Sequence, residues 1–209
     1  MPALPLSTDA FVLLKRPPAD TFQTFTLFSP THGALLALQR ISRKTATSAA
    51  SSSSPLDLFD EVSLRLESSN QGQTWFVKES QLIISHADIG RSYDTLRHAS
   101  ALAALVARNP VPEESRGQVA ALLRQALASF ATVARPDFVW FKSLYIFARD
   151  EGYPIKEQWF PTLPAADRET VATLLNRPLA EQTAAPAAVE RLTLRLAEYL
   201  RGHTEILLD

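Results

Sequence analysis

The chain has 209 residues, of which 46% are hydrophobic and 21% are charged, as is usual for a globular protein. Its formal net charge is -1, so any contact with nucleic acid must come from a local basic patch. The absence of cysteine excludes a disulfide framework, a thiol nucleophile and a cysteine zinc site. No apolar run approaches membrane-spanning length and no signal-peptide pattern opens the chain, so we expect a cytoplasmic protein without membrane contact.

A β-hairpin is predicted between Thr21 and Lys44, and the rest of the N-terminal part is organised around it. Phe25 and Leu27 lie on one side of an alternating run, which is the pattern of a strand. The opposite side of the run carries Phe22, Thr24, Thr26 and Phe28. The segment Ser29 to Gly33 supplies turn residues, and Ala34 to Leu38 is a second apolar run of strand length.

Further strands are predicted on both sides of this hairpin. Ala10 to Arg16 is an apolar run, and Leu56 to Leu66 alternates between apolar and polar residues. Trp75 to Val77 begins another strand, which Leu82 to Ile84 either ends or follows as one more strand. Thr45 to Pro55 is small and polar, which predicts a mobile loop. Some five short strands without a helix favour a small closed barrel, because closure leaves no strand edge unpaired.

The hydrophobic period then changes from two to between three and four, which predicts helices. The segments with this pattern are Asp88 to Asn109, Glu113 to Val133, Asp137 to Asp150, Ala165 to Asn176 and Ala187 to His203. The third is apolar nearly all round, so we expect it at the centre of the helices. The sequence therefore predicts a two-domain α+β chain, with a five-stranded barrel over residues 1–85 and an α-helical domain over residues 86–209.

Residues typical of catalysis or metal binding do not cluster in the sequence. The four histidines are scattered. His86 lies two residues before an acidic residue, Asp88, and a linker or capping pair is the favoured interpretation over a metal or general-base site. With six glycines in the chain, none of the phosphate-binding glycine motifs is present. We therefore expect a protein that is not an enzyme and has no cofactor or metal.

Basic residues gather in the first fifty positions, where only Asp9 and Asp20 oppose them. They are Lys15, Arg16, Arg40, Arg43 and Lys44. A barrel with a cationic face is typical of single-strand binders, in which cations follow phosphates and aromatic rings stack on bases. The alternative is that these charges keep strand ends soluble and block edge pairing. The aromatic residues that would have to stack are equally well explained as barrel core; they are Phe22, Phe25, Phe28, Trp75 and Phe76.

Three stretches resemble the bacterial recombination mediator RecO. AFVLLKRP (Ala10 to Pro17) and TLFSPTHGALLALQRISRK (Thr26 to Lys44) are similar to its N-terminal domain. The matching places in its T-L-F-T-x-x-x-G-x-L-x-A core and basic tail are held by Thr26, Leu27, Phe28, Gly33, Leu35, Ala37, Arg43 and Lys44. DFVWFKSLYIFARDEGYP (Asp137 to Pro154) is similar to the family's F-E-L-x-L-L-x-x-x-G-Y-x-P helix end. The resemblance thus covers both predicted domains in the family's order.

The chain departs from the family at three places. Ile41 stands where the basic tail usually has glycine. Thr45 to Pro55 is polar where the family is often more basic, which implies weaker binding to DNA. The paired cysteines that bind zinc in many members are absent, so no metal is carried over from the family.

The resemblance implies an OB-fold barrel followed by a helical domain. It also implies binding to single-stranded and double-stranded DNA, annealing of complementary strands, and help in loading RecA onto SSB-coated DNA together with RecR. Arg40, Arg43 and Lys44 match the basic tail of the family, and Lys15 and Arg16 lie near its early arginine. We expect these five side chains to contact phosphates in DNA repair and recombination.

The helical domain of the family also binds the acidic and apolar C-terminal tail of SSB. Lys142 is a cation within the apolar third helix, at a place where the family often has arginine, so the resemblance suggests that it meets a carboxylate of that tail. The alternative is a lysine that extends from a core helix to solvent. Two rival functions stay open from the sequence: a protein–protein adaptor with the same fold and little affinity for DNA, and an RNA-binding barrel.

Overall fold

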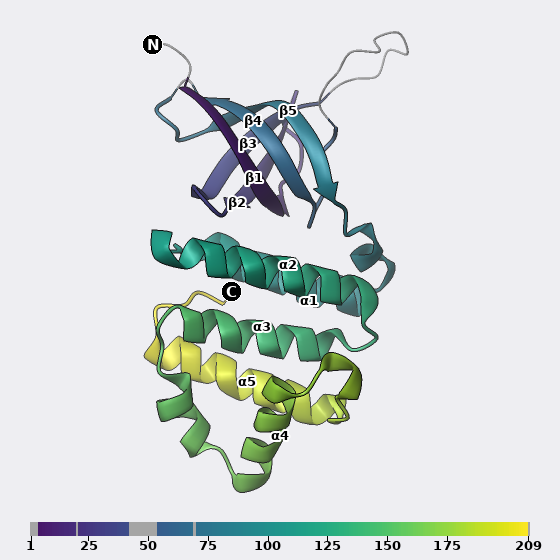
Figure 1. The fold of residues 1–209 in the computed structure, drawn as a ribbon, viewed down its shortest axis with the longest axis vertical. Coiled ribbons are helices and arrows are strands. Elements are labelled where there is room, and N and C mark those ends of the chain that lie inside the picture. The colour runs from purple at the N-terminus through teal and green to yellow at the C-terminus, as the bar shows by residue number, and fades with distance from the viewer. Residues whose placement is uncertain (1–3, 20, 42–53, 69, 209) are drawn as a thin grey trace. The chain divides into compact units, whose positions relative to one another are not determined.

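The computed structural model describes residues 4–19, 21–41, 54–68 and 70–208. Five strands precede the helices, which confirms the predicted α+β organisation (Figure 1). By internal contacts the chain divides into two compact units. The first, here called the barrel unit, is Met1–Ala87 with Pro110–Ala120, and the second, the helical unit, is Asp88–Asn109 with Ala121–Asp209. The sequence pattern assigned Pro110–Ala120 to the helices, whereas its contacts group it with the strands.

The strands form a closed barrel in the order β1-β2-β3-β5-β4. Their bounds are β1 (Leu4–Lys15), β2 (Phe22–Ser29), β3 (Gly33–Arg40), β4 (Glu61–Ser68) and β5 (Trp75–Ile84). Neighbouring strands are antiparallel except β3 and β5, which pair in parallel at Ala37 with Trp75 and at Leu38 with Phe76. β1 pairs with both β4 and β2, and its pairing with β2 shifts register between Val12 and Leu14. The strand is therefore shared by two neighbours, which closes the barrel.

The starts of two strands differ from the sequence prediction. β1 begins at Leu4, before the predicted Ala10. β4 begins only at Glu61, although the apolar pattern starts at Leu56. The backbone at Phe59 has a φ of 69°, a left-handed conformation that interrupts a strand. Leu82 to Ile84 end β5, which confirms one of the two alternatives that the sequence left open. Most of the predicted loop Thr45 to Pro55 lies outside the described residues.

The alternation predicted for β2 decides which residues fill the barrel. Phe25 and Leu27 are 1% and 0% exposed and pack in one cluster with Leu35 and Ala37 of β3. The intervening residues of β2 are half-buried on the outer face; they are Phe22, Thr24 and Thr26. Phe28 is on the outer side by alternation but is also buried. The interior of the barrel is thus the side that the sequence assigned to Phe25 and Leu27.

The turn between β2 and β3 is held by a residue from the segment Pro110–Ala120. Arg116 Nη1 donates a hydrogen bond of 2.9 Å to the Thr31 carbonyl oxygen. Gly33 follows with a φ of +69°, and a Cβ placed there would lie 3.1 Å from Arg116 Nε. Glycine is therefore favoured at this position both by the backbone conformation and by the space that Arg116 leaves.

In the described part of the chain, five α-helices follow the barrel strands. They are α1 (Tyr93–Arg108), α2 (Arg116–Thr132), α3 (Pro136–Asp150), α4 (Ala165–Asn176) and α5 (Pro186–His203). The first is capped by Ser92, whose side chain accepts a hydrogen bond from the Thr95 N–H. Pro136 and Pro186 occupy the first positions of α3 and α5, where a missing N–H costs nothing. None of the helices among the described residues combines the length and the apolar character needed to cross a bilayer.

The third helix lies at the centre of the helical unit, as its apolar sequence predicted. It contacts α1, α4 and α5 (Figure 1). Phe138, Phe141, Leu144 and Phe147 of α3 are between 0% and 1% exposed. The fourth and fifth helices are also joined by Asp167, whose carboxylate accepts hydrogen bonds from Arg191 and Arg195 at 2.7 and 2.8 Å.

We predict that Gly33→Ala lowers the free energy of unfolding by about 1 kcal/mol or more, because alanine is strained at positive φ and its methyl group meets Arg116. Urea unfolding followed by circular dichroism measures this change. The control is Gly117→Ala: Gly117 is exposed in α2 with no atom within 4 Å of an added Cβ. There alanine should raise the free energy of unfolding by about 0.5 to 1 kcal/mol. A Gly33→Ala variant as stable as the unmodified protein would contradict this description of the turn.

Candidate nucleic-acid interface

Two of the predicted basic residues lie on strands that flank the beginning of β2. The Arg16 N–H donates a hydrogen bond of 3.0 Å to the Thr24 carbonyl oxygen, which places Arg16 beside β2 at the end of β1. Arg40 is paired with Phe22 across the β2–β3 ladder. Because paired residues point to the same side of a sheet, Arg40 shares the outer face of the barrel with Phe22. The first residues of β2 thus lie between two cations.

Arg16 and Arg40 are both exposed, and within the described ranges neither forms an ion pair. Their guanidinium groups are therefore available to an anion in solvent. Arg43 and Lys44, the other two residues of the predicted basic tail, lie outside the described residues, so their prediction as phosphate contacts stays a prediction.

Lys15 has an internal partner that the sequence did not reveal. Its Nζ lies 3.1 Å from Asp57 Oδ1, with the two side chains 38% and 73% exposed. Asp57 precedes β4 and is distant from Lys15 along the chain, so no local pattern links them. Two further cations of the barrel are also paired: Arg65 with Glu79 at 3.1 Å and Lys78 with Glu67 at 3.0 Å. Lys15 therefore contributes less free positive charge than the sequence suggested.

The aromatic residues of the barrel separate into core and surface. Phe25, Phe28 and Trp75 are 1%, 1% and 7% exposed, as expected for core residues. Phe22 and Phe76 are half-buried, and their rings contact each other with centroids 5.8 Å apart and planes at 70°. The alternation of β2 already placed Phe22 opposite Phe25 in the sequence, but nothing local indicated that Phe76 would meet it. An aromatic pair therefore lies beside Arg40 on the outer face.

Lys142, the predicted partner-binding residue, lies between two helices of the helical unit. Its Nζ donates a hydrogen bond of 3.3 Å to the carbonyl oxygen of Arg177, the residue that caps the C-terminus of α4. Partial burial lowers the pKa of the Lys142 amine below its ordinary value. A cation at a helix C-terminus is stabilised by the helix dipole. This contact gives Lys142 a structural role, and its role in binding a partner stays a prediction.

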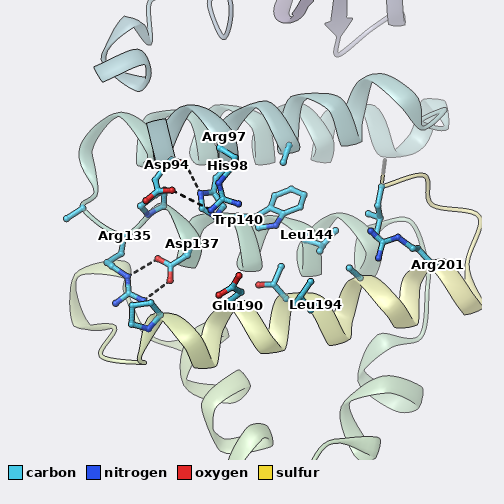
Figure 2. A pocket seen from close by; sticks show the side chains of 17 residues that line it. Asp94, Arg97, His98, Arg135, Asp137, Trp140, Leu144, Glu190, Leu194 and Arg201 are labelled. Carbon is cyan, nitrogen blue, oxygen red and sulfur yellow. Dashed lines mark hydrogen bonds and ion pairs between the residues drawn. The ribbon is translucent and has the colours of Figure 1, made fainter. Parts of the chain in front are cut away.

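A pocket of about 520 Å³ lies elsewhere in the helical unit, between α1, α3 and α5. Trp140, Leu144 and Leu194 contribute apolar side chains to it, and Leu194 is 56% exposed. Figure 2 shows Arg135 and Arg201 at opposite ends of this pocket. Lys142 does not line it. We call this cavity the helical pocket.

The charged residues of the helical pocket are largely paired with one another. Arg135 donates to both carboxylate oxygens of Asp137, at 2.9 and 2.6 Å (Figure 2). Arg97 lies 3.5 Å from the Asp94 carboxylate on α1. An incoming anion would have to compete with these aspartates, so the apolar lining is the stronger basis for binding here.

His86 is not paired with Asp88, the acidic residue that lies two positions after it in the sequence. Asp88 forms an ion pair of 3.0 Å with Arg91. His86 is 6% exposed, and among the described residues its Nε2 is buried without a hydrogen-bond partner. The negative charges of Asp60 and Glu61 act on it. Burial lowers the pKa of His86 and raises that of Asp60. Among the described residues, no three His, Asp or Glu side chains converge as metal ligands.

Comparison with known proteins adds no family assignment. No family model matches the chain, and no curated protein matches it either.

We predict that the barrel loses stability as the pH falls below about 6.5, the ordinary pKa of histidine. The folded pKa of His86 is lowered, so on acidification the unfolded chain takes up the proton that the folded chain resists. The raised pKa of Asp60 acts in the opposite direction, between its ordinary value of 3.8 and its raised value in the folded protein. Urea unfolding at about pH 7.5 and 5.5 measures the effect. His86→Gln should reduce the difference between the two pH values, and equal stability of the unmodified protein at both would contradict the prediction.

Proposed function

We propose that the chain binds nucleic acid through the outer face of β2 and β3 and acts as a recombination mediator of RecO type. The observation that carries this proposal is a pair of exposed cations, Arg16 and Arg40, on either side of the β2 residues of that face, neither of which has an ion-pair partner among the described residues. Positive groups fixed on a sheet face neutralise backbone phosphates and release their counterions. The protein would act by binding and positioning strands and would make or break no covalent bond.

The strand order supports the OB-fold part of this proposal. An OB-fold is a five-stranded Greek-key barrel that binds nucleic acid on the face of strands 2 and 3 and with the loops between strands 1 and 2 and between strands 4 and 5. The present barrel has the order β1-β2-β3-β5-β4 with β3 parallel to β5. Arg16 begins its β1–β2 connection and Arg40 ends its β3, so both lie where such a barrel meets its ligand.

In the proposed role, the barrel holds single-stranded or double-stranded DNA by its phosphates and brings complementary strands together. With RecR as a partner, it would help to load RecA onto SSB-coated DNA during DNA repair. These partners come from the resemblance of Ala10 to Pro17 and Thr26 to Lys44 to RecO. The helical unit provides the surface for protein partners.

The rival proposal is an adaptor that has the same fold but little affinity for DNA. The observation that favours it is the internal pairing of Lys15, Arg65 and Lys78 with Asp57, Glu79 and Glu67. These pairs leave the described part of the barrel with few unpaired cations. A protein of this kind would bind no DNA even at low salt, whereas an RNA-binding barrel would prefer RNA to DNA of equal length.

We predict that Arg40→Gln weakens DNA binding and reduces the slope of log affinity against log salt concentration by about 1, as expected for one lost phosphate contact. Fluorescence polarisation of a labelled oligonucleotide at several salt concentrations measures both quantities. The control is Arg65→Gln, which removes an exposed arginine of the same barrel that is already paired with Glu79. Equal effects of the two substitutions would place the DNA elsewhere.

We also propose that an acidic and apolar SSB tail binds in the helical pocket, and that its apolar residues cover Trp140 and Leu194. This location differs from the one that the sequence suggested. Lys142 lies outside the pocket and donates its hydrogen bond to the carbonyl oxygen of Arg177 at the end of α4.

We predict that Leu194→Glu weakens binding of an SSB-tail peptide at least tenfold, because it puts a like charge into the apolar lining. Isothermal titration of the peptide measures the affinity. Lys142→Glu is the matched substitution outside the pocket and should leave the affinity unchanged. The reverse outcome, with loss only in Lys142→Glu, would restore the site predicted from the sequence.

A further inference from the structure

Phe22 and Phe76 come from strands that are not neighbours in the barrel. Phe22 begins β2 and Phe76 lies at the start of β5, with β3 between them. Phe22 is paired with Arg40 and Phe76 with Leu38, so both side chains flank the same end of β3. Their rings meet with centroids 5.8 Å apart. Two aromatic side chains therefore join across the outer face of a strand whose last residue is an exposed arginine.

This pair does not belong to the barrel core. The core cluster contains Phe25, Leu27 and Trp75, whereas Phe22 and Phe76 stay half-buried. Partly exposed aromatic surface beside cations that have no ion pair in the described part of the chain suits single-stranded nucleic acid, because bases stack on rings while phosphates meet positive charge. Arg40 opposite Phe22 and Arg16 beside Thr24 supply those charges.

We propose that Phe22 and Phe76 form a base-stacking platform, so that this face prefers single-stranded DNA to duplex. The inference rests on the proposed function and narrows the ligand of this face from nucleic acid to single-stranded DNA. Duplex bases are stacked on each other and offer no free face, whereas an unpaired base does. The arginines contact phosphates of single-stranded and duplex DNA alike. They therefore contribute affinity for both ligands but no preference for the single strand.

The angle between the rings limits how a base can be held. Their planes meet at 70°, so a flat base cannot lie parallel to both rings at once. One ring stacks on the base and the other lines its edge, which makes a corner for a single base. The two phenylalanines should therefore contribute unequally to affinity, with the larger loss at the ring that stacks.

The test measures affinity for a labelled oligothymidine of about 16 nucleotides, the upper site size of one OB-fold. A blunt duplex of equal length is the second ligand, and both titrations are done at low salt. Phe22→Leu and Phe76→Leu keep an apolar side chain but remove the ring. At least one of them should weaken single-strand binding about tenfold and leave duplex binding within about twofold. Phe22→Trp keeps an aromatic face and should retain single-strand binding.

The outcomes separate this inference from the proposed function. If the unmodified protein binds neither ligand, the proposed function and the platform both fail. If it binds both ligands and neither leucine variant weakens single-strand binding, the platform is wrong and the phosphate interface stands. Equal losses for both ligands in a folded leucine variant would also overturn the platform. Arg40→Gln is the matched control, because it should weaken the two ligands by similar factors.

Discussion

The packing of one side of β2 into the barrel core is the constraint on which the rest of the account depends. Phe25 and Leu27 fill the interior with Leu35 and Ala37 of β3. Because side chains alternate along a strand, this packing forces Phe22 and Thr24 onto the outer face. A slip of one residue would exchange the two faces, so the buried side fixes the exposed one. The aromatic and cationic surface is in this sense a consequence of the core.

The β2–β3 turn maintains that register. Ser29 pairs with Gly33 at the closed end of the hairpin, and Phe22 pairs with Arg40 at its open end. Arg116 holds the turn through the Thr31 carbonyl, and the positive φ of Gly33 lets the chain reverse there. A residue from the segment Pro110–Ala120 thus supports a hairpin whose far end carries the candidate interface. The helical unit has its own core around α3 and its own pocket, as the proposed division between nucleic-acid and protein ligands requires.

The sequence predicted the elements better than it predicted their contacts. The alternation of β2 and the periodicity of Ala165–Asn176 are local signals, and both elements were confirmed. The pairing of Lys15 with Asp57 joins residues far apart along the chain, and no local pattern reports it. The ring contact between Phe22 and Phe76 depends on the parallel pairing of β3 and β5. The hydrophobic pattern within one β-strand does not encode which strands pair. The left-handed backbone at Phe59 explains why an apolar run beginning at Leu56 became a strand only at Glu61.

The most direct test of the account is a map of the bound strand on the protein in solution. In a ¹H–¹⁵N correlation spectrum of the labelled protein, oligothymidine should shift the amides of Phe22 to Thr26 and of Leu36 to Arg40. The amides of Ser63 to Arg65 on β4, which pair with Glu79 to Gln81 away from Phe76, should stay in place and serve as the internal reference. Shifts confined to β4 or to the helical unit, with none in β2 and β3, would contradict the central claim.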